Sequence, residues 1–111
     1  MPIKDPSRYP ANWKDLRATV LERAGHCCEG SPAYPDCRAA NYEPHPVTGS
    51  RVVLTTAHLD HTPENDDLSN LRAWCQRCHL KYDGDARRET RRLATVANAV
   101  AIFRRLLEEA P

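Results

Sequence analysis

The 111-residue chain has few large apolar side chains: one phenylalanine, two tryptophans and a single methionine at position 1. A chain this short buries little apolar surface, and small domains often depend on a metal ion or on disulfides for stability. No run of about 18 apolar residues occurs, which excludes a membrane-spanning helix. The first residues also lack the charged-then-apolar pattern of a signal peptide, so we expect one cytoplasmic domain without a membrane partner.

The five cysteines carry the clearest signal in the sequence. In a reducing compartment clustered cysteines are more often metal ligands than disulfides, and an odd number leaves one thiol over in any pairing. Cys75 and Cys78 form a CxxC turn, a spacing at which two thiolates reach one tetrahedral zinc ion. We predict that Cys28 and Cys37 complete a four-thiolate structural zinc site. Cys27 remains the alternative to Cys28, because an adjacent pair rarely binds the same small ion.

Two other interpretations of the CxxC turn stay open. The run from Cys75 to His79 matches the CxxCH signature of c-type haem attachment, but attachment requires export and the chain has no internal methionine as an axial ligand. A thioredoxin-like redox turn would follow a strand in a βαβ unit, which the sequence does not show. Zinc is therefore the favoured occupant.

The pattern of apolar residues in the first half predicts an arm, a helix and a loop. Residues 1–11 hold three prolines and should be extended. Residues 12–24 place apolar side chains on one helical face, with Asn12 as the N-cap and Gly25 as the stop. Residues 26–50 are dense in cysteine, proline, glycine and asparagine and have no periodicity, which is typical of a loop.

The second half predicts a strand and two helices. Residues 51–56 are rich in β-branched side chains and should form a strand, followed by a polar loop over 60–70. A short helix is expected over 78–82, ended by Gly84. A long basic and amphipathic C-terminal helix follows within 84–111, and its apolar residues recur at three- and four-residue intervals. These residues are Leu93, Val96, Val100, Phe103 and Leu107.

The charges are distributed unevenly, although the formal net charge is only +1. Seven basic residues against three acids lie between positions 72 and 92, whereas four acids crowd into positions 60–67. A basic face beside an acidic pocket suits an enzyme that binds phosphates and holds a divalent cation. The predicted phosphate contacts among them are Arg72, Arg77, Arg87, Arg88, Arg91 and Arg92.

Three histidines, His58, His61 and His79, lie in the same part of the sequence as these acids. Each could act in the hydrolysis of a phosphodiester bond. A neutral imidazole can take a proton from water near pH 7. A Mg²⁺-type ion needs few protein ligands and binds substrate phosphate directly. One histidine at a strand end, one on a helix and a nearby carboxylate would suffice.

The chain resembles the HNH motif of ββα-metal nucleases in three runs: Ala57-His58-Leu59-Asp60-His61, Asn70-Leu71 and Cys75-Gln76-Arg77-Cys78-His79. Over residues 12–83 it is similar to small HNH proteins of phages and prophages. The resemblance implies an α+β fold, with a ββα-metal core over 12–83 and a four-cysteine zinc site. An N-terminal helix and a long C-terminal helix should flank this core.

The same resemblance implies the roles of the site residues. Asn70 should fix the loop that carries the general base, and His79 should bind a catalytic Mg²⁺ or Mn²⁺ ion. We favour His58 as the base because its distance from Asn70 suits the usual loop length, with Asp60 or His61 helping to hold the ion. The reverse assignment, His61 as the base beside Asp60, stays open.

The function implied is a metal-dependent endonuclease that nicks or cuts DNA with little or no sequence specificity, since phosphate contacts position a duplex without reading it. The competing hypothesis is a non-catalytic zinc module that binds nucleic acid or protein. That module would explain the cysteines but would leave the histidines and Asn70 without a role. A homodimer or a phage packaging partner is a further expectation from the resemblance alone.

Overall fold

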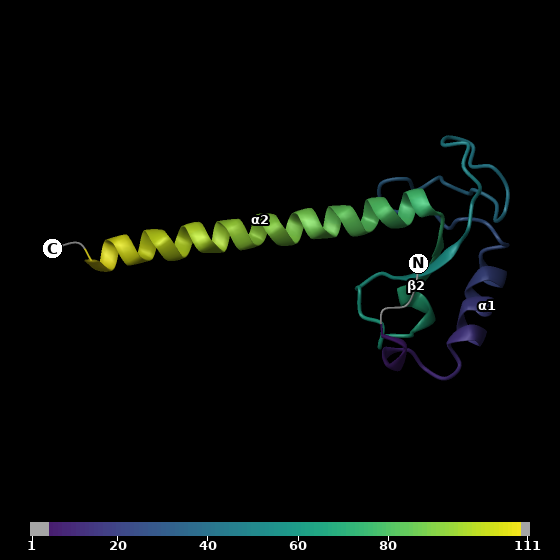
Figure 1. Ribbon diagram of the computed structural model, residues 1–111, viewed down its shortest axis with the longest axis horizontal. Coiled ribbons are helices and arrows are strands. Elements are labelled where there is room, and N and C mark those ends of the chain that lie inside the picture. Colours follow the sequence, from purple (N-terminus) through teal and green to yellow (C-terminus); the bar gives the residue numbers. More distant parts are fainter. Residues whose placement is uncertain (1–4, 110–111) are drawn as a thin grey trace.

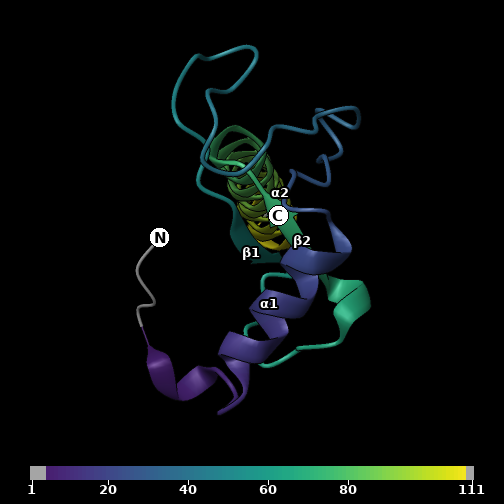
Figure 2. The ribbon, with the colours of Figure 1, turned by 90° about the vertical axis from the view of Figure 1, so that its right-hand side faces the viewer.

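A two-stranded antiparallel sheet is followed directly by a long helix that extends away from the rest of the structure (Figure 1). The computed structural model describes residues 5–109 of the chain. In chain order the elements are η1 (Pro6–Arg8), α1 (Trp13–Arg23), β1 (Thr55–His58), η2 (Leu68–Asn70), β2 (Leu71–Trp74) and α2 (Gln76–Glu109). Figure 2 shows α2 nearly end-on, with irregular loops on one side of it and α1 with η1 on the other. The expected α+β class is confirmed.

The N-terminal helix lies within one residue of its predicted limits. Gly25 ends it with a left-handed backbone (φ +64°), which glycine adopts at little cost. Asn12 precedes the helix, but its side chain makes no capping hydrogen bond. Val20 is fully buried, and Trp13 and Leu21 pack beside it against the core. The apolar face read from the sequence is therefore the buried face.

Residues 5–11 are not extended throughout, which corrects the expectation for the arm. Pro6–Arg8 form a 3-10 turn whose first residue follows Asp5, and the Asp5 carboxylate accepts a hydrogen bond from the Ser7 N–H. Arg8 then forms a two-pronged ion pair with Glu64, with N···O distances of 2.6 and 2.9 Å. Residues 1–4 of the expected arm lie outside the described residues.

The first strand begins four residues later than predicted. β1 pairs with β2 from Thr55 opposite Trp74 to His58 opposite Leu71. The chain turns into α2 immediately after β2, so residues 51–54 have no strand opposite them. Val52 and Leu54 are still buried, and their N–H groups find a carbonyl and a side-chain amide instead. Their β-branched and apolar character reflects burial rather than strand pairing.

Residues 5–86 form the packed part of the structure, which we call the head. Its core is small and centres on β2. Leu71 and Trp74, expected as core residues, are 0% and 1% exposed. The Trp74 indole N–H donates to the carbonyl of Gly30, and the N–H of Glu29 donates to the carbonyl of Ala73. These hydrogen bonds attach the loop after α1 to β2. They matter because that loop has few apolar side chains of its own.

α2 is one continuous helix of 34 residues, so the predicted break at Gly84 is wrong. Glycine in a helix costs about 1 kcal/mol relative to alanine, which a run of good helix formers on both sides outweighs. Asp85 accepts ion pairs from Lys81, four residues earlier, and from Arg88, three residues later. Such pairs at one-turn spacing stabilise the helix across the glycine.

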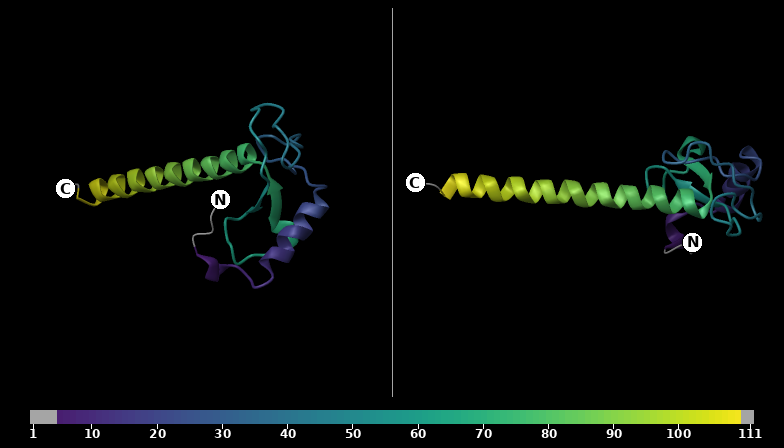
Figure 3. Two further views of the ribbon diagram at one scale, coloured as in Figure 1. Left: turned by 45° about the vertical axis from the view of Figure 1, so that its right-hand side comes forward. Right: turned by 90° about the horizontal axis from the view of Figure 1, so that it is seen from above.

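Most of α2 projects away from the head, as both views in Figure 3 show. The radius of gyration is 19.0 Å, against about 13 Å for a compact domain of 100 residues. Every residue from 87 to 109 is exposed, including the apolar stripe from Leu93 to Leu107, whose large members are 46–63% exposed. Despite its length, neither α2 nor another helix within residues 5–109 is apolar enough to cross a membrane.

A substitution at Gly84 tests whether α2 is continuous. Gly84→Ala should raise the free energy of unfolding by about 0.5–1 kcal/mol, since alanine is the better helix former. A Cβ atom there would meet only the end of the flexible Arg88 side chain, at 4.0 Å. The measurement is the midpoint of chemical denaturation.

Gly25→Ala is the matched control, because its Cβ also meets open space but its φ is positive. It should destabilise the protein by roughly 1–2 kcal/mol. Loss of stability in Gly84→Ala would show that the helix breaks at residue 84.

Candidate functional site

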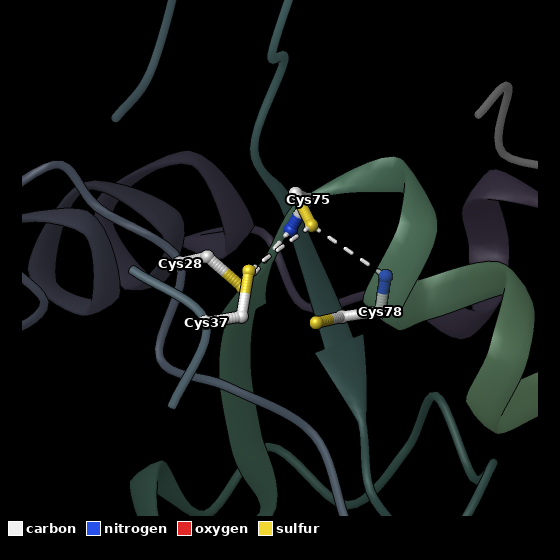
Figure 4. Close-up of side chains that lie close together, drawn as sticks. All are labelled: Cys28, Cys37, Cys75 and Cys78. Carbon is white, nitrogen blue, oxygen red and sulfur yellow. Dashed lines mark hydrogen bonds between the residues drawn. The ribbon is translucent and has the colours of Figure 1, made fainter. Parts of the chain in front are cut away.

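Four cysteine side chains meet at the junction of β2 and α2 (Figure 4). The sulfur atoms of Cys28, Cys37, Cys75 and Cys78 all lie within 4.8 Å of one another. Two come from the loop after α1, one follows β2 directly, and one belongs to the first turn of α2. The structure thus brings together the four cysteines favoured by the sequence. Cys27 lies outside the cluster, where its backbone forms an isolated bridge with Ala40.

The set of four thiols favours a metal ion at this cluster, because a bound cation offsets the cost of ionising them. Burial raises the pKa of Cys28 and raises the pKa of Cys78 to about 11, so these thiols keep their protons near pH 7 unless a cation replaces them. Four sulfur ligands suit zinc or another soft divalent ion. Cys75 and Cys78 are fully buried and face the other two thiols, which favours an ion over an attached haem.

Backbone N–H groups point at two of the sulfurs. Cys28 Sγ accepts from the N–H groups of Gly30 and Cys75, each at 3.4 Å, and Cys75 Sγ accepts from the N–H of Cys78 at 3.5 Å. Such donors stabilise thiolates, as is common at thiolate metal sites. Cys37 is the least buried of the four. Burial raises its pKa, but the hydrogen bonds of its sulfur, beginning with the one from the Ala39 backbone, outweigh this and leave it lowered.

A cavity of about 290 Å³ lies where α1, β1, the following loop and α2 meet. Its wall contains all three histidines of the HNH-like motif. The charged or aromatic residues that line it include Trp13, Arg17, His58, His61, His79 and Asp83. Polar groups that converge in one cavity are the usual mark of a binding or catalytic site.

His58, the last residue of β1, is held firmly in the cavity wall. Its Nε2 atom lies 3.2 Å from an Asp66 carboxylate oxygen, and its side chain is 8% exposed. The ring stacks on Trp13 with centroids 5.2 Å apart and planes 12° apart. Two separate contacts therefore fix the orientation of this imidazole.

Asp83 joins the other two histidines. One carboxylate oxygen lies 3.1 Å from His61 Nε2 and the other 3.2 Å from His79 Nε2. His79 Nδ1 lies 2.8 Å from the Thr55 hydroxyl, which ties α2 to β1. Burial lowers the pKa of His79 more than the neighbouring Asp83 carboxylate raises it, so the ring is neutral and available to a metal ion near pH 7.

The sequence did not single out Asp83 as a site residue, although a signal was present. Asp83 follows His79 by four residues, the spacing that places two side chains on one helical face. The sequence predicts a helix that ends at residue 82, and a helix of that length does not include Asp83. Its role depends on the helix continuing through Gly84.

Asn70 makes three hydrogen bonds within the loop after β1. Its side-chain oxygen accepts from the Asp60 N–H, and its amide donates to the Asp60 carboxylate at 2.9 Å and to the Asn65 carbonyl at 3.0 Å. Hydrogen bonds from Asn65, Asn70 and the Thr62 N–H lower the pKa of Asp60 to about 2. Asp60 therefore faces the loop interior and is not among the residues that line the cavity. Its role as a metal ligand stays a prediction.

Two of the six arginines predicted to contact phosphates bind other groups of the head instead. Arg72 donates to the backbone carbonyls of Ser69 and Leu71. The Arg77 guanidinium lies 3.6 Å from the centre of the Tyr34 ring, a cation–π contact. Neither lines the cavity.

The other four lie on the exposed part of α2. Arg88 and Arg92 pair with acids three residues earlier, and Arg87 and Arg91 are exposed to solvent. The arginine that lines the cavity is Arg17 of α1, which the sequence did not identify because its position depends on how α1 packs.

Comparison of the chain with protein-family models, curated proteins and solved structures gives no match. The resemblance to HNH nucleases therefore rests on the motif of the sequence alone.

Single cysteine substitutions test which thiols bind the metal. Cys28→Ala should lose the metal and much of the ordered loop, because three sulfurs bind zinc far more weakly than four. Cys27→Ala, its neighbour outside the cluster, should keep one equivalent of zinc. Elemental analysis and limited proteolysis measure both effects. Metal retained in Cys28→Ala and lost in Cys27→Ala would reverse the assignment.

Proposed function

We propose that the protein is a metal-dependent endonuclease of the HNH type that hydrolyses phosphodiester bonds of DNA. The observation that carries the proposal is the convergence of His58, His61, His79 and Asp83 on one cavity. The order of the elements supports it, since β1, the loop after it and α2 supply these residues, and β1, β2 and α2 follow one another as in a ββα unit. The four-cysteine cluster, as a structural zinc site, anchors the helix that carries two of them.

His58 is the general base in this proposal. With Asp66 accepting a hydrogen bond from Nε2–H, Nδ1 is the basic nitrogen that takes a proton from the attacking water. Asp66 then stabilises the imidazolium that forms, and stacking on Trp13 keeps the ring in place. As the water oxygen bonds to phosphorus, the bond from phosphorus to the leaving oxygen breaks.

Asp83 and His79 are the proposed ligands of a Mg²⁺ or Mn²⁺ ion, with His61 beside them. When bound, the ion would neutralise charge on the phosphate and on the leaving oxygen. Asp83 now uses one oxygen for each imidazole, so an ion would replace one or both of these contacts. We assign to Asp83 the carboxylate role for which the sequence offered Asp60, because Asp83 lines the cavity and Asp60 does not.

The remaining polar residues position the loop and the substrate. Asn70 and Asp60 hold the loop through three hydrogen bonds between loop segments, which keeps His58 and His61 on the same wall. Arg17 supplies a positive charge at the cavity for a backbone phosphate.

A plasmid nicking assay tests this function. The wild-type protein should convert supercoiled DNA to open circles with Mg²⁺ or Mn²⁺ and not with EDTA. His58→Ala should lower the rate by about 10²–10⁴-fold while Mn²⁺ binding persists, because a base does not hold the ion. Asp83→Asn should lose both cutting and Mn²⁺ binding, which electron paramagnetic resonance measures.

Asp85→Asn is the matched control, since it lies two residues further along α2 and pairs only with surface cations. It should cut at the wild-type rate. If His61→Ala loses cutting and keeps Mn²⁺ whereas His58→Ala cuts normally, His61 is the base. A wild-type protein that holds zinc but cuts under no metal condition is the non-catalytic zinc module.

Arg17→Ala tests the phosphate contact. Loss of one phosphate contact should make DNA affinity less dependent on salt, reducing the slope of log K against log salt by about 1. Arg88→Ala should change the slope less, because Arg88 is already paired with Asp85. Fluorescence anisotropy of a labelled duplex in EDTA measures both slopes. Equal slopes for wild type and Arg17→Ala would contradict the assignment.

A further inference from the structure

His45 lies against the cysteine cluster, although it belongs to no motif in the sequence. It is 5% exposed, and its Nε2 atom lies 3.7 Å from Cys37 Sγ. On the other side of the ring, Nδ1 accepts hydrogen bonds from the N–H groups of Val47 at 3.0 Å and Thr48 at 3.3 Å. The ring therefore connects a backbone turn to one sulfur of the metal centre.

These contacts determine which ring nitrogen carries the proton. A backbone N–H can only donate, so Nδ1 must be the unprotonated nitrogen. In the neutral ring the proton is then on Nε2, and Nε2–H points to Cys37 Sγ. His45 is the donor and the sulfur is the acceptor.

Cys37 differs from the other three cysteines in its access to solvent. It lines an open cavity of about 340 Å³, whereas Cys28, Cys75 and Cys78 are 0% exposed. It is the thiolate that an external reagent reaches first. The donors to Cys28 and Cys75 are backbone groups, but this donor to Cys37 is a side chain that can be replaced.

We propose that His45 protects the Cys37 thiolate by this hydrogen bond and so sets the rate at which the metal centre is opened by electrophiles. A hydrogen bond to a thiolate takes up part of its charge and lowers its nucleophilicity. The inference depends on the metal centre and not on the proposed nuclease activity.

Iodoacetamide is a suitable probe of this protection. The Cys37 sulfur bonds to the CH₂ carbon of the reagent, the carbon–iodine bond breaks, and iodide leaves. The product is an uncharged thioether, which binds zinc weakly, so the ion is released. A chelator in solution that changes colour when it binds zinc measures the release. The experiment uses a Cys27→Ala background, which removes the one cysteine outside the cluster.

Two substitutions separate the two sides of the ring. In His45→Asn the side-chain oxygen can replace Nδ1 as the acceptor of the hydrogen bonds from the turn, but the shorter side chain brings no N–H donor to Cys37. In His45→Gln the longer side chain can bring an amide N–H to the position of Nε2, but the acceptor in the turn is lost. Both variants must first show one equivalent of bound zinc.

The proposal predicts that His45→Asn releases zinc about tenfold faster than wild type, with Cys37 the first residue alkylated, and that His45→Gln stays within about twofold of wild type. In the Co²⁺-substituted protein the sulfur-to-cobalt absorption should shift to lower energy in His45→Asn alone, because the freed thiolate is the better electron donor. Mass spectrometry identifies the alkylated residue.

Other outcomes overturn the proposal. If His45→Asn behaves as wild type, the ring serves only to cap the turn. If both variants accelerate equally, the effect follows the loss of ring packing and not of the N–H donor. If His45→Asn fails to bind zinc, the wild-type protein decides, since first alkylation at a cysteine other than Cys37 would show that attack on Cys37 does not set the rate at which the centre opens.

Discussion

The four-cysteine cluster is the constraint on which the rest of the head depends. Within residues 5–109 the core contains one fully buried aromatic side chain, Trp74, and the loop after α1 contributes little apolar surface to it. Two sulfurs from that loop meet two from the junction of β2 and α2, so one bound ion would order both segments at once. Because Cys78 lies in the first turn of α2, the cluster also sets where that helix begins. Its direction determines on which side of the sheet the next residue, His79, lies.

The cavity exists because three independent contacts place the sheet, the loop and α2 together. The register of β1 against β2 puts His58 at the end of the strand, and Asn70 closes the loop that leads back to β2. The Thr55 hydroxyl joins β1 to His79, while α1 forms the remaining wall through Trp13. Each contact involves residues far apart in sequence. The site is therefore a product of the fold and not of one segment.

Sequence reasoning succeeded where spacing along the chain determines the chemistry. The CxxC turn predicted two members of the four-cysteine cluster, and the structure places His58 at the end of β1, Asn70 at the end of η2 and His79 in α2. It failed where a distant segment decides. Residues 51–54 look like a strand, but their only pairing is an isolated bridge between Arg51 and Pro44, because β2 ends at Trp74. Gly84 reads as a helix stop, yet hydrogen bonding and ion pairs on both sides carry α2 through it. Asp83 was missed with that helix, and Arg17 was missed because only packing places α1 at the cavity.

Adjacent residues in α2 would then serve two metal ions of different character. Cys78 is fully buried among sulfurs, which select soft ions such as zinc, whereas the side chain of His79, 16% exposed, meets a carboxylate at a cavity open to solvent. An oxygen and nitrogen ligand set that keeps water suits Mg²⁺ or Mn²⁺. In this proposal the two ions would differ in what they connect. Zinc would join the loop after α1 to the start of α2, since two of its sulfur ligands come from each. The catalytic ion would make no such link between distant segments through His79 and Asp83, because both belong to α2 and the Thr55 hydroxyl already ties His79 to β1.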